Sequence, residues 1–408
     1  MGQANDAGER VYDVIVVGAG QAGLSAAGHL VRKGVQPWSD FVILDANDGP
    51  GGAWRHRWDS LTFDRAHGIH DLPGMSLGAA DPEEPASRVV ARYYGQYEAE
   101  LALPVVRPVA VSCVRREGDV FGIKSEDGRQ WRARTVISAA GTWDSPYVPY
   151  YPGIADFRGR YLHTRGFTAP EDFVDQDVLV VGGGASALQF LLQLDAAGAR
   201  TVWSTRRTPG WTTPISGPDW GIDVEAMVAE RTRSGLPPTS VASVTGVPLT
   251  EQYRDGLDAG VLISRGGLSR ILGDAVILDG PGPDGRGAPS QGLIADRILA
   301  EGGMSRIRQL PGSPLDASMS NGEHPWRTPI DTILWATGFR ASLNHLAPLR
   351  IREPGGGVRM APDGVSVPRA PGLFLVGYGA SASTIGATRA GRKAAIAALR
   401  AVSDPVSA

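Results

Sequence analysis

Two glycine-rich turns have the residue types and spacing that cradle the phosphates of a dinucleotide. They are residues 18–23 (GAGQAG) and residues 182–187 (GGGASA). In such a turn the first glycine permits a tight bend, the second lets the backbone approach a pyrophosphate, and the third small residue lets helix pack on strand. The N–H groups at the helix start then face the negative charge. The predicted phosphate-binding residues are Gly18, Gly20, Gln21, Ala22 and Gly23 in the first turn, and Gly182, Gly184, Ala185 and Ser186 in the second.

The residues that end the next strand distinguish the two turns. Asp45 follows the first turn and is placed to accept hydrogen bonds from ribose hydroxyls. The second turn is followed instead by Arg206 and Arg207. Guanidinium groups pair with a 2′-phosphate, whereas a carboxylate would repel it. We therefore expect FAD at the first turn and NADPH at the second, with a solvated pair of surface arginines as the alternative for Arg206 and Arg207.

Each turn lies within a predicted β-α-β unit, the element that positions its glycines. An apolar run of strand length precedes each turn, and an apolar helical stretch follows it. The first unit is predicted as strand 12–17, helix 21–32 and strand 41–44, and the second as strand 177–181, a helix to about 197 and strand 201–205.

The remaining patterns complete an α/β fold with two Rossmann-like three-layer dinucleotide-binding domains. Short β-branched runs separated by turns at 109–133 predict a small antiparallel β-meander. Residues 210–329 are rich in glycine and proline, so we expect loops there, with helices near 223–233 and 291–301. The predicted division is an FAD-binding domain in two parts, 1–163 and 332–408, into which an NADPH-binding domain, 164–331, is inserted.

Composition narrows the classes of partner. The 408 residues carry a net charge of −3, which does not suggest binding to nucleic acid. The single cysteine, Cys113, excludes an internal disulfide and a disulfide reductase's cysteine pair, and it fits a reducing compartment. The sequence contains no run of about 18 apolar residues, so it predicts no membrane-spanning helix. We expect a cytoplasmic protein without nucleic-acid or membrane partners and without a metal site.

Four further segments, residues 51–55 (GGAWR), 141–146 (GTWDSP), 157–167 (FRGRYLHTRGF) and 334–339 (LWATGF), resemble motifs of the flavin-containing monooxygenases. The third is similar to that family's FxGxxxHxxx(Y/F) fingerprint, and the resemblance covers roughly residues 11–210 and 328–400. It implies that His163 links the domains and positions NADP. The further positions that it implies for cofactor contacts are Gly52, Ala53, Trp54, Arg55, Gly141, Thr337, Gly338, Gly377, Thr384 and Ile385.

One departure from the family concerns the oxygen chemistry. Well-known members place an asparagine beside the flavin, soon after the GGxW segment, but this chain has no asparagine between Asn47 and Asn321. Another group must then stabilise the oxygen adduct. The candidate catalytic residues are Arg65, His67 and His70, with an ordinary polar loop as the alternative.

The activity that the resemblance implies is that of a flavin-dependent monooxygenase. NADPH would reduce FAD, and a C4a-(hydro)peroxyflavin formed with O2 would oxygenate a small organic substrate at nitrogen or sulfur, or a ketone. The alternatives are an NADPH-dependent flavin dehydrogenase or oxidase without a productive peroxyflavin, and a dinucleotide-binding redox sensor. The resemblance leaves a homodimer open.

Overall fold

The computed structural model describes most of the chain, and its contacts divide those residues into two compact units. The first unit combines the residues up to Ser145 with residues 228–238 and the residues from Arg340 onward, and the second combines the described residues between Pro146 and Phe339 apart from 228–238. The described residues are 10–66, 69–207, 209–213, 228–238, 246–279, 295–296, 313–314, 326–382 and 384–404.

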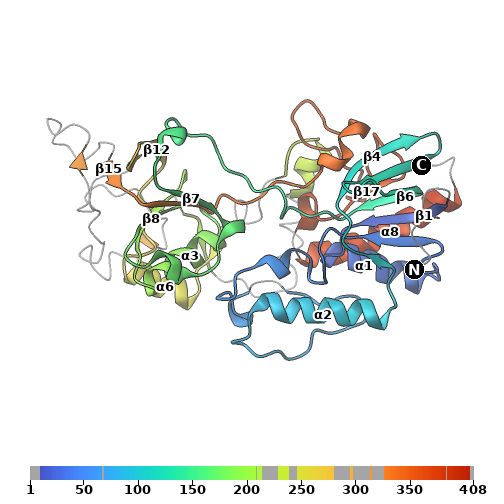
Figure 1. The fold of residues 1–408 in the computed structure, drawn as a ribbon, viewed down its shortest axis with the longest axis horizontal. Helices are drawn as coiled ribbons and strands as arrows, with labels where there is room; N and C mark the ends of the chain where they lie inside the picture. The colour runs from blue at the N-terminus through green and yellow to red at the C-terminus, as the bar shows by residue number, and fades with distance from the viewer. Residues whose placement is uncertain are drawn as a thin grey trace. The chain divides into compact units, whose positions relative to one another are not determined.

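A parallel sheet and an antiparallel meander share one long strand in the first unit (Figure 1). The strand is β6, Gln130–Ser138. Its residues 130–133 pair antiparallel with β5, its last three residues pair parallel with β17, and β1 pairs parallel with residues 132–138. The meander was thus predicted correctly, although it ends within a strand rather than at a turn before a new one. The sheet order is β3-β2-β1-β6-β5-β4, and the other strands are β1 Val11–Val17, β2 Phe41–Leu44, β3 Val105–Val106, β4 Val111–Glu117, β5 Val120–Ser125 and β17 Leu373–Leu375.

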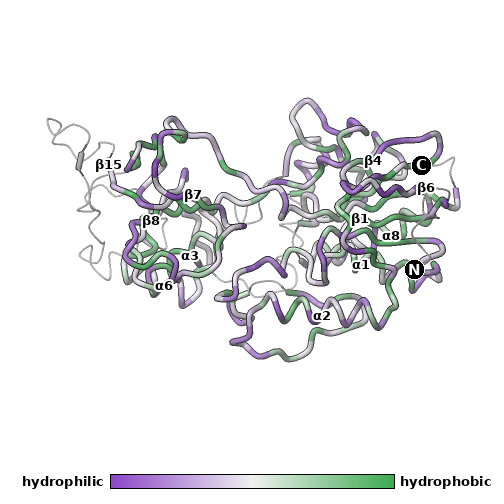
Figure 2. Tube along the Cα trace, in the orientation of Figure 1, coloured by the Kyte–Doolittle hydropathy of each residue, from purple (hydrophilic) through white to green (hydrophobic). Residues whose placement is uncertain are grey.

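The two faces of β1 pack against different partners. Val14 and Val16 face a core that includes helices α1 (Gln21–Arg32), α2 (Ala86–Glu100) and α8 (Thr384–Ser403), and Figure 1 shows α1 and α8 side by side. Ile15 and Val17 face the meander. Alternate residues of a strand point to opposite faces, so the continuous apolar run of β1, visible in Figure 2, fills both cores.

The second unit is built on a four-stranded parallel sheet in the order β7-β16-β8-β9. One short helix, α3 (Ala185–Ala196), follows β8 as predicted. The strands are β7 Arg160–His163, β8 Asp177–Val181, β9 Arg200–Ser204 and β16 Thr332–Trp335. Both β7 and β16 belong to this sheet, so the unit boundaries lie at Ser145/Pro146 and Phe339/Arg340 rather than after 163 and 331.

An antiparallel sheet occupies part of the region that was predicted as loops. Its order is β12-β13-β15-β14, and Leu268, Val276 and Trp326 pack with Leu179 and Trp335 of the parallel sheet. The strands are β12 Leu268–Ile271, β13 Ala275–Leu278, β14 Ser313–Pro314 and β15 Trp326–Pro329. Runs of four residues or fewer between glycine-rich turns carry little periodicity, which explains why the sequence did not reveal them.

The remaining helices and strands of the second unit are short, and they lie outside the two larger sheets. Helix α6, Glu251–Asp258, is capped by Thr250, whose hydroxyl accepts a hydrogen bond from the Tyr253 N–H. Strand β10, Trp211–Thr212, pairs with β11, Val247–Pro248. Of the predicted helices near 223–233 and 291–301, residues 228–233 and 295–296 are helical, and the rest lie outside the described residues. No helix among the described residues is long and apolar enough to cross a membrane.

Acid sensitivity of the first unit is expected to depend on His345, which is buried beside the end of β6. Its Nε2 lies 3.0 Å from Ser138 Oγ, and burial lowers its pKa to about 4. The unfolded chain binds this proton near pH 6.5, so the stabilisation present above pH 6.5 is lost progressively as the pH falls towards 4, by up to about 3 kcal/mol. Denaturant unfolding of wild type and His345→Gln from pH 7.5 to 4.5 measures this, and an equal pH dependence in both proteins would contradict it.

Candidate functional site

The first glycine turn lies where four parallel strands of the first unit end. The register places Val17 opposite Leu44 and Ser138, and Ser138 opposite Leu375. The residues that leave β1, β2, β6 and β17 therefore emerge at one edge of the sheet. The carboxyl edge of a parallel sheet is where such folds bind ligands.

The three glycines of the first turn have three different surroundings. Gly18 has a φ of +100°, and a Cβ there would lie 2.6 Å from the Ala139 carbonyl oxygen. A Cβ on Gly23 would lie 1.9 Å from the carbonyl oxygen of Gly18. Gly20 has ordinary extended backbone angles, and a Cβ there would meet no atom within 4 Å. Gly18 and Gly23 are thus required by the fold, whereas Gly20 leaves space for something other than protein.

That space fits the diphosphate of a dinucleotide. Gly20 is the N-cap of α1, and no side chain caps the helix. The first N–H groups of the helix, with the positive end of its dipole, face the same edge. An anion bound there would satisfy these groups.

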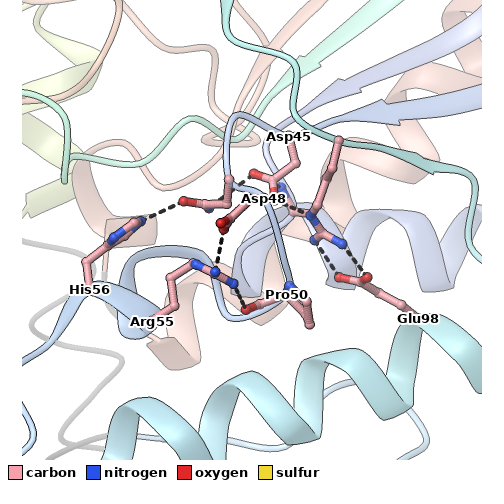
Figure 3. Close-up of polar contacts among 9 residues, drawn as sticks. Asp45, Asp48, Pro50, Arg55, His56 and Glu98 are labelled. Atoms are coloured by element: carbon pink, nitrogen blue, oxygen red, sulfur yellow. Dashed lines mark hydrogen bonds and ion pairs between the residues drawn. The ribbon is translucent and has the colours of Figure 1, made fainter.

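Asp45, at the end of β2, lies within a network of charged groups beside the turn (Figure 3). Its Oδ2 accepts a hydrogen bond from Arg107 Nε at 2.7 Å, and its Oδ1 is 3.4 Å from the Ala19 N–H nitrogen. Glu98 of α2 binds both terminal nitrogens of Arg107, at 2.6 and 2.7 Å. Burial acts to lower the pKa of Arg107, but its hydrogen bonds to Glu98 and Asp45 outweigh burial and leave the pKa raised. Arg107 thus fixes the orientation of the carboxylate predicted to bind ribose.

Replacing Arg107 by glutamine is expected to weaken FAD binding about tenfold, the order of one lost charge-assisted hydrogen bond. The side chains of Arg107 and Asp45 are only 12% and 6% exposed, so removal of the cation also leaves a buried carboxylate without its partner. Titration of the apo-protein with FAD, followed by flavin fluorescence, measures the affinity. Arg115→Gln, which removes an exposed arginine paired with Glu117, is the control. Wild-type FAD affinity in the Arg107 variant would contradict this role.

The GGxW segment packs directly on the first turn. A Cβ on Gly52 would lie 2.8 Å from the Cα of Gly20, so this glycine allows the 3-10 helix Gly52–His56 to approach the turn closely. Arg55 donates to the Pro50 carbonyl oxygen at 2.8 Å and pairs with Asp48, as Figure 3 shows. The structure therefore brings Gly52, Trp54 and Arg55 to the edge that carries the turn.

The two remaining glycines predicted for the first site also come together. A Cβ on Gly377, after β17, would lie 3.7 Å from the Cα of Gly141, after β6. Thr384 and Ile385 begin helix α8, and only their backbone is described. Contacts of these residues with a cofactor stay predictions.

The three candidate catalytic residues have different outcomes. Arg65 is exposed in the 3-10 helix Phe63–Arg65, and His67 lies outside the described residues. The carbonyl oxygen of His70 accepts a hydrogen bond from Gln21 Nε2 at 3.1 Å, which holds His70 against the start of α1. Burial lowers the pKa of His70, and Arg389 adds to this while Asp71 opposes it. His70 is therefore the candidate for which the structure gives a fixed place next to the turn.

Gln21 has a structural role that the sequence did not reveal. Its Nε2 also donates to Thr388 Oγ1 of α8 at 2.9 Å, and its Oε1 accepts a hydrogen bond from the Tyr94 hydroxyl of α2. The buried side chain thus joins three helices. A contact between Gln21 and a cofactor would be made by the backbone at the start of α1.

The second turn repeats the geometry of the first within the second unit. Gly182 has a φ of +146°, and a Cβ there would lie 2.2 Å from the Ala336 carbonyl oxygen. A Cβ on Gly184, the N-cap of α3, would meet no atom within 4 Å. Ala187 occupies the third position and is buried. This turn therefore also fits a diphosphate at the start of its helix.

Arg206 and Arg207 are exposed immediately beyond β9. The Thr205 hydroxyl donates to the carbonyl oxygen of Arg207 at 2.7 Å and contacts Ser264 Oγ at 2.8 Å. Burial raises the pKa of Tyr151, and the positive charge of Arg206 partly offsets this increase. These contacts order the loop that carries the two guanidinium groups at the carboxyl edge.

His163 joins the ends of β7 and β16 inside the second unit. Its Nδ1 accepts a hydrogen bond from the Arg165 N–H at 3.1 Å, so Nε2 carries the proton and donates to the Gly338 carbonyl oxygen at 3.0 Å. Burial lowers the pKa of this imidazole, and Arg165 lowers it further. Thr337 donates to the Tyr147 carbonyl oxygen. The proposed contact of His163 with NADP stays a prediction.

Arg107, Glu98 and Arg57 are the site residues that the sequence did not single out. Arg57 lies over the indole rings of Trp54, Trp58 and Trp143, next to the GGxW segment. An arginine two positions after Arg55 belongs to no motif considered above. The described residues contain no cluster of three or more side chains suited to hold a metal ion.

Comparison with known proteins connects this geometry to flavoproteins. Residues 15–244 match the family described as pyridine nucleotide-disulphide oxidoreductase. The flavin-containing monooxygenase from Stenotrophomonas maltophilia is 30% identical, with a TM-score of 0.71 over 95% of this chain and 98% of that chain. The fold prediction of a two-domain α/β flavoprotein is thus confirmed.

Two curated relatives match the chain over a shorter length. An uncharacterized oxidoreductase of Geobacillus kaustophilus is 28% identical over 186 residues, which are 46% of this chain and 52% of the relative. An indole-3-pyruvate monooxygenase of Oryza sativa subsp. japonica is 29% identical over 201 residues, 48% of each protein. The chain therefore spans about half the length of the curated relatives that it matches.

Proposed function

The chain belongs to the pyridine nucleotide-disulphide oxidoreductase family and, within it, to the flavin-containing monooxygenases, and on this basis we propose that it is an FAD-dependent monooxygenase that takes electrons from NADPH. Its substrate is a small organic molecule and its second substrate is O2. The similarity to the flavin-containing monooxygenase of Stenotrophomonas maltophilia supports this proposal, since it extends over nearly the whole of both chains.

The observation that carries the proposal is the pair of equivalent glycines, Gly20 and Gly184. Each is the N-cap of the helix after a parallel strand, and a Cβ on either would meet no protein atom within 4 Å. Each neighbouring first glycine, by contrast, is required by a close backbone contact. Two such spaces in one chain support two dinucleotides, one for each unit.

The side chains around the two turns have separable roles. FAD, when bound, would accept a hydride from NADPH and supply the reactivity toward O2. The first N–H groups of α1 would bind its diphosphate, and Asp45, held by Arg107, would accept hydrogen bonds from the ribose. The uncharged Nε2–H tautomer of His163 keeps the ends of β7 and β16 together beside the second turn.

NADPH rather than NADH is proposed from the two arginines beyond β9. Arg206 and Arg207 occupy the position that carries an acidic residue in the first unit, and both are exposed, so either guanidinium could pair with a 2′-phosphate. The proposed location is the cytoplasm, where NADPH is abundant and a lone cysteine such as Cys113 stays reduced.

A second function, that of an NADPH-dependent flavin dehydrogenase or oxidase, is favoured by one observation. No asparagine occurs between Asn47 and Asn321, so the group that well-known family members place beside the flavin is absent. Such an enzyme would release all of its reducing equivalents as peroxide, or pass them to another acceptor.

Stoichiometry with labelled oxygen distinguishes the two functions. The FAD-loaded protein is reduced with NADPH without oxygen and then mixed with ¹⁸O₂ and a panel of amines, sulfides and ketones. A monooxygenase incorporates one ¹⁸O atom into product for each NADPH consumed, and peroxide decreases correspondingly. Stoichiometric peroxide with every compound would favour the oxidase, and no reduction by NADPH would reject the cofactor assignment.

A further inference from the structure

Tyr151, in the second unit, combines a fixed ring with an unpaired hydroxyl. The ring stacks on the indole of Trp335, with the ring centroids 5.8 Å apart and the planes at 13°. Tyr151 is half-buried, and within the described ranges its hydroxyl makes no hydrogen bond and is open to solvent. The phenol is therefore an oriented hydrogen-bond donor that no described acceptor of the protein uses.

The stacking partner of this tyrosine lies at the edge of the sheet that carries the second glycine turn. Trp335 is the last residue of β16, and it pairs with Val181, the residue before Gly182. Val181 pairs in turn with Ser204, the last residue of β9. The ring of Tyr151 thus packs at the carboxyl edge of the parallel sheet, where the turn and the loop after β9 also lie.

The loop after β9 and the segment that follows Tyr151 are both hydrogen-bonded to the stretch of chain that runs from Gly266 to the end of β12. The Gly266 carbonyl oxygen accepts a hydrogen bond from the Thr205 N–H at 3.0 Å. At the end of β12, the Ile271 N–H donates to the Pro152 carbonyl oxygen at 2.9 Å. One strand therefore holds the tyrosine segment and the arginine loop in a fixed relation to each other.

The charges around the phenol include a cation that has no carboxylate partner. Burial raises the pKa of Tyr151, Arg206 opposes this increase, and Tyr147 and Asp279 add to it. Arg206 is exposed, and in the described part of the chain it forms no ion pair. The phenol therefore lies within electrostatic range of an unpaired guanidinium, the one proposed above to bind the 2′-phosphate of NADPH.

We propose that Tyr151 is a further specificity-determining residue for the coenzyme, and that its hydroxyl donates a hydrogen bond to the 2′-phosphate bound by Arg206. A phosphate group has three strong acceptor oxygens, so a guanidinium and a phenol can bind it together. The stacked ring already holds the phenol in one orientation, which lowers the entropy cost of the contact. This inference rests on the proposed function, because it concerns the preference for NADPH at the same site.

Binding of ADP-ribose and of 2′-phospho-ADP-ribose to the FAD-loaded protein tests the proposal without flavin reduction. The two probes differ only in the 2′-phosphate, and calorimetry gives their dissociation constants. We expect Tyr151→Phe to weaken binding of 2′-phospho-ADP-ribose about tenfold, the order of one charge-assisted hydrogen bond, and to leave binding of ADP-ribose unchanged. Phenylalanine keeps an aromatic ring on Trp335, so this variant removes the hydroxyl and retains the packing.

The matched control is Tyr150→Phe, which removes the same hydroxyl from the adjacent tyrosine, a residue that is 81% exposed. It should change neither affinity. Unchanged affinity for 2′-phospho-ADP-ribose in Tyr151→Phe would overturn the proposal, and so would an equal loss with both probes. A wild-type protein that binds both probes equally would overturn it together with the NADPH assignment. Failure of the monooxygenase proposal would appear separately, in the oxygen experiment.

Discussion

Replacing Gly20 by valine is expected to weaken FAD binding by at least about 100-fold while the apo-protein remains folded. The backbone at Gly20 is extended, and its Cβ would meet no protein atom within 4 Å, so the new side chain costs the fold little. The same side chain would occupy the space next to the helix start and remove several charge-assisted hydrogen bonds to the diphosphate, each contributing about 1.5–3 kcal/mol. Flavin content after purification and FAD titration of the apo-protein measure the loss.

Gly23→Ala is the matched comparison, and we expect it to lower the stability of the apo-protein, which Gly20→Val leaves nearly unchanged. Its Cβ would lie 1.9 Å from the carbonyl oxygen of Gly18, so α1 and β1 must separate. Overpacking of this kind costs about 1–3 kcal/mol of unfolding free energy, or more. Thermal unfolding of the two apo-proteins distinguishes the cases. A Gly20→Val protein that binds FAD normally, or that unfolds as easily as Gly23→Ala, would contradict the assignment of Gly20 to the cofactor.

Replacing both Arg206 and Arg207 by serine is expected to reduce kcat/KM for NADPH about 100-fold and to change kcat/KM for NADH little. The two coenzymes differ only in the 2′-phosphate, and each lost guanidinium–phosphate pair is worth about a factor of ten or more. Steady-state rates of flavin reduction with each coenzyme give the ratio.

Arg200→Gln serves as the control for this pair. Arg200 is an exposed arginine at the other end of β9, where its Nε binds Asp177 Oδ1 at 2.8 Å. It should not alter the coenzyme preference. An equal loss with NADPH and NADH in the double variant would show that the arginines act on a part common to both coenzymes.

The parts of the site that could be predicted from the sequence are those set by local conformation. A glycine turn, the strand before it and the helix after it lie within about 30 residues, so their pattern is visible directly. The different needs of Gly18, Gly20 and Gly23 follow from that geometry. The acidic residue at the end of the second strand was found in the same way.

The parts that the sequence did not reveal depend on residues distant along the chain. Arg107 meets Asp45 and Glu98 only because β3 pairs with β2 and α2 packs nearby, and neither Arg107 nor Glu98 belongs to a motif. Arg57 lies over the indole ring of Trp143, which is 86 residues further along the chain and follows strand β6. The predicted division after 163 differs from the compact units for a related reason, since β7 has only four residues and its sheet becomes apparent only when β16 pairs with it.

The return of residues 228–238 to the first unit limits how the protein can be re-engineered. These residues sit between two stretches of the second unit in sequence, yet the Thr232 carbonyl oxygen accepts a hydrogen bond from the Met360 N–H at 3.1 Å, and a Cβ on Gly379 would lie 2.7 Å from Thr232 Cγ2. The second unit therefore cannot be exchanged between homologues as one piece by cutting at 145 and 340. A chimera made in that way would replace residues 228–238 of the first unit as well. A chimera that keeps the first unit intact requires two additional junctions, one on each side of 228–238.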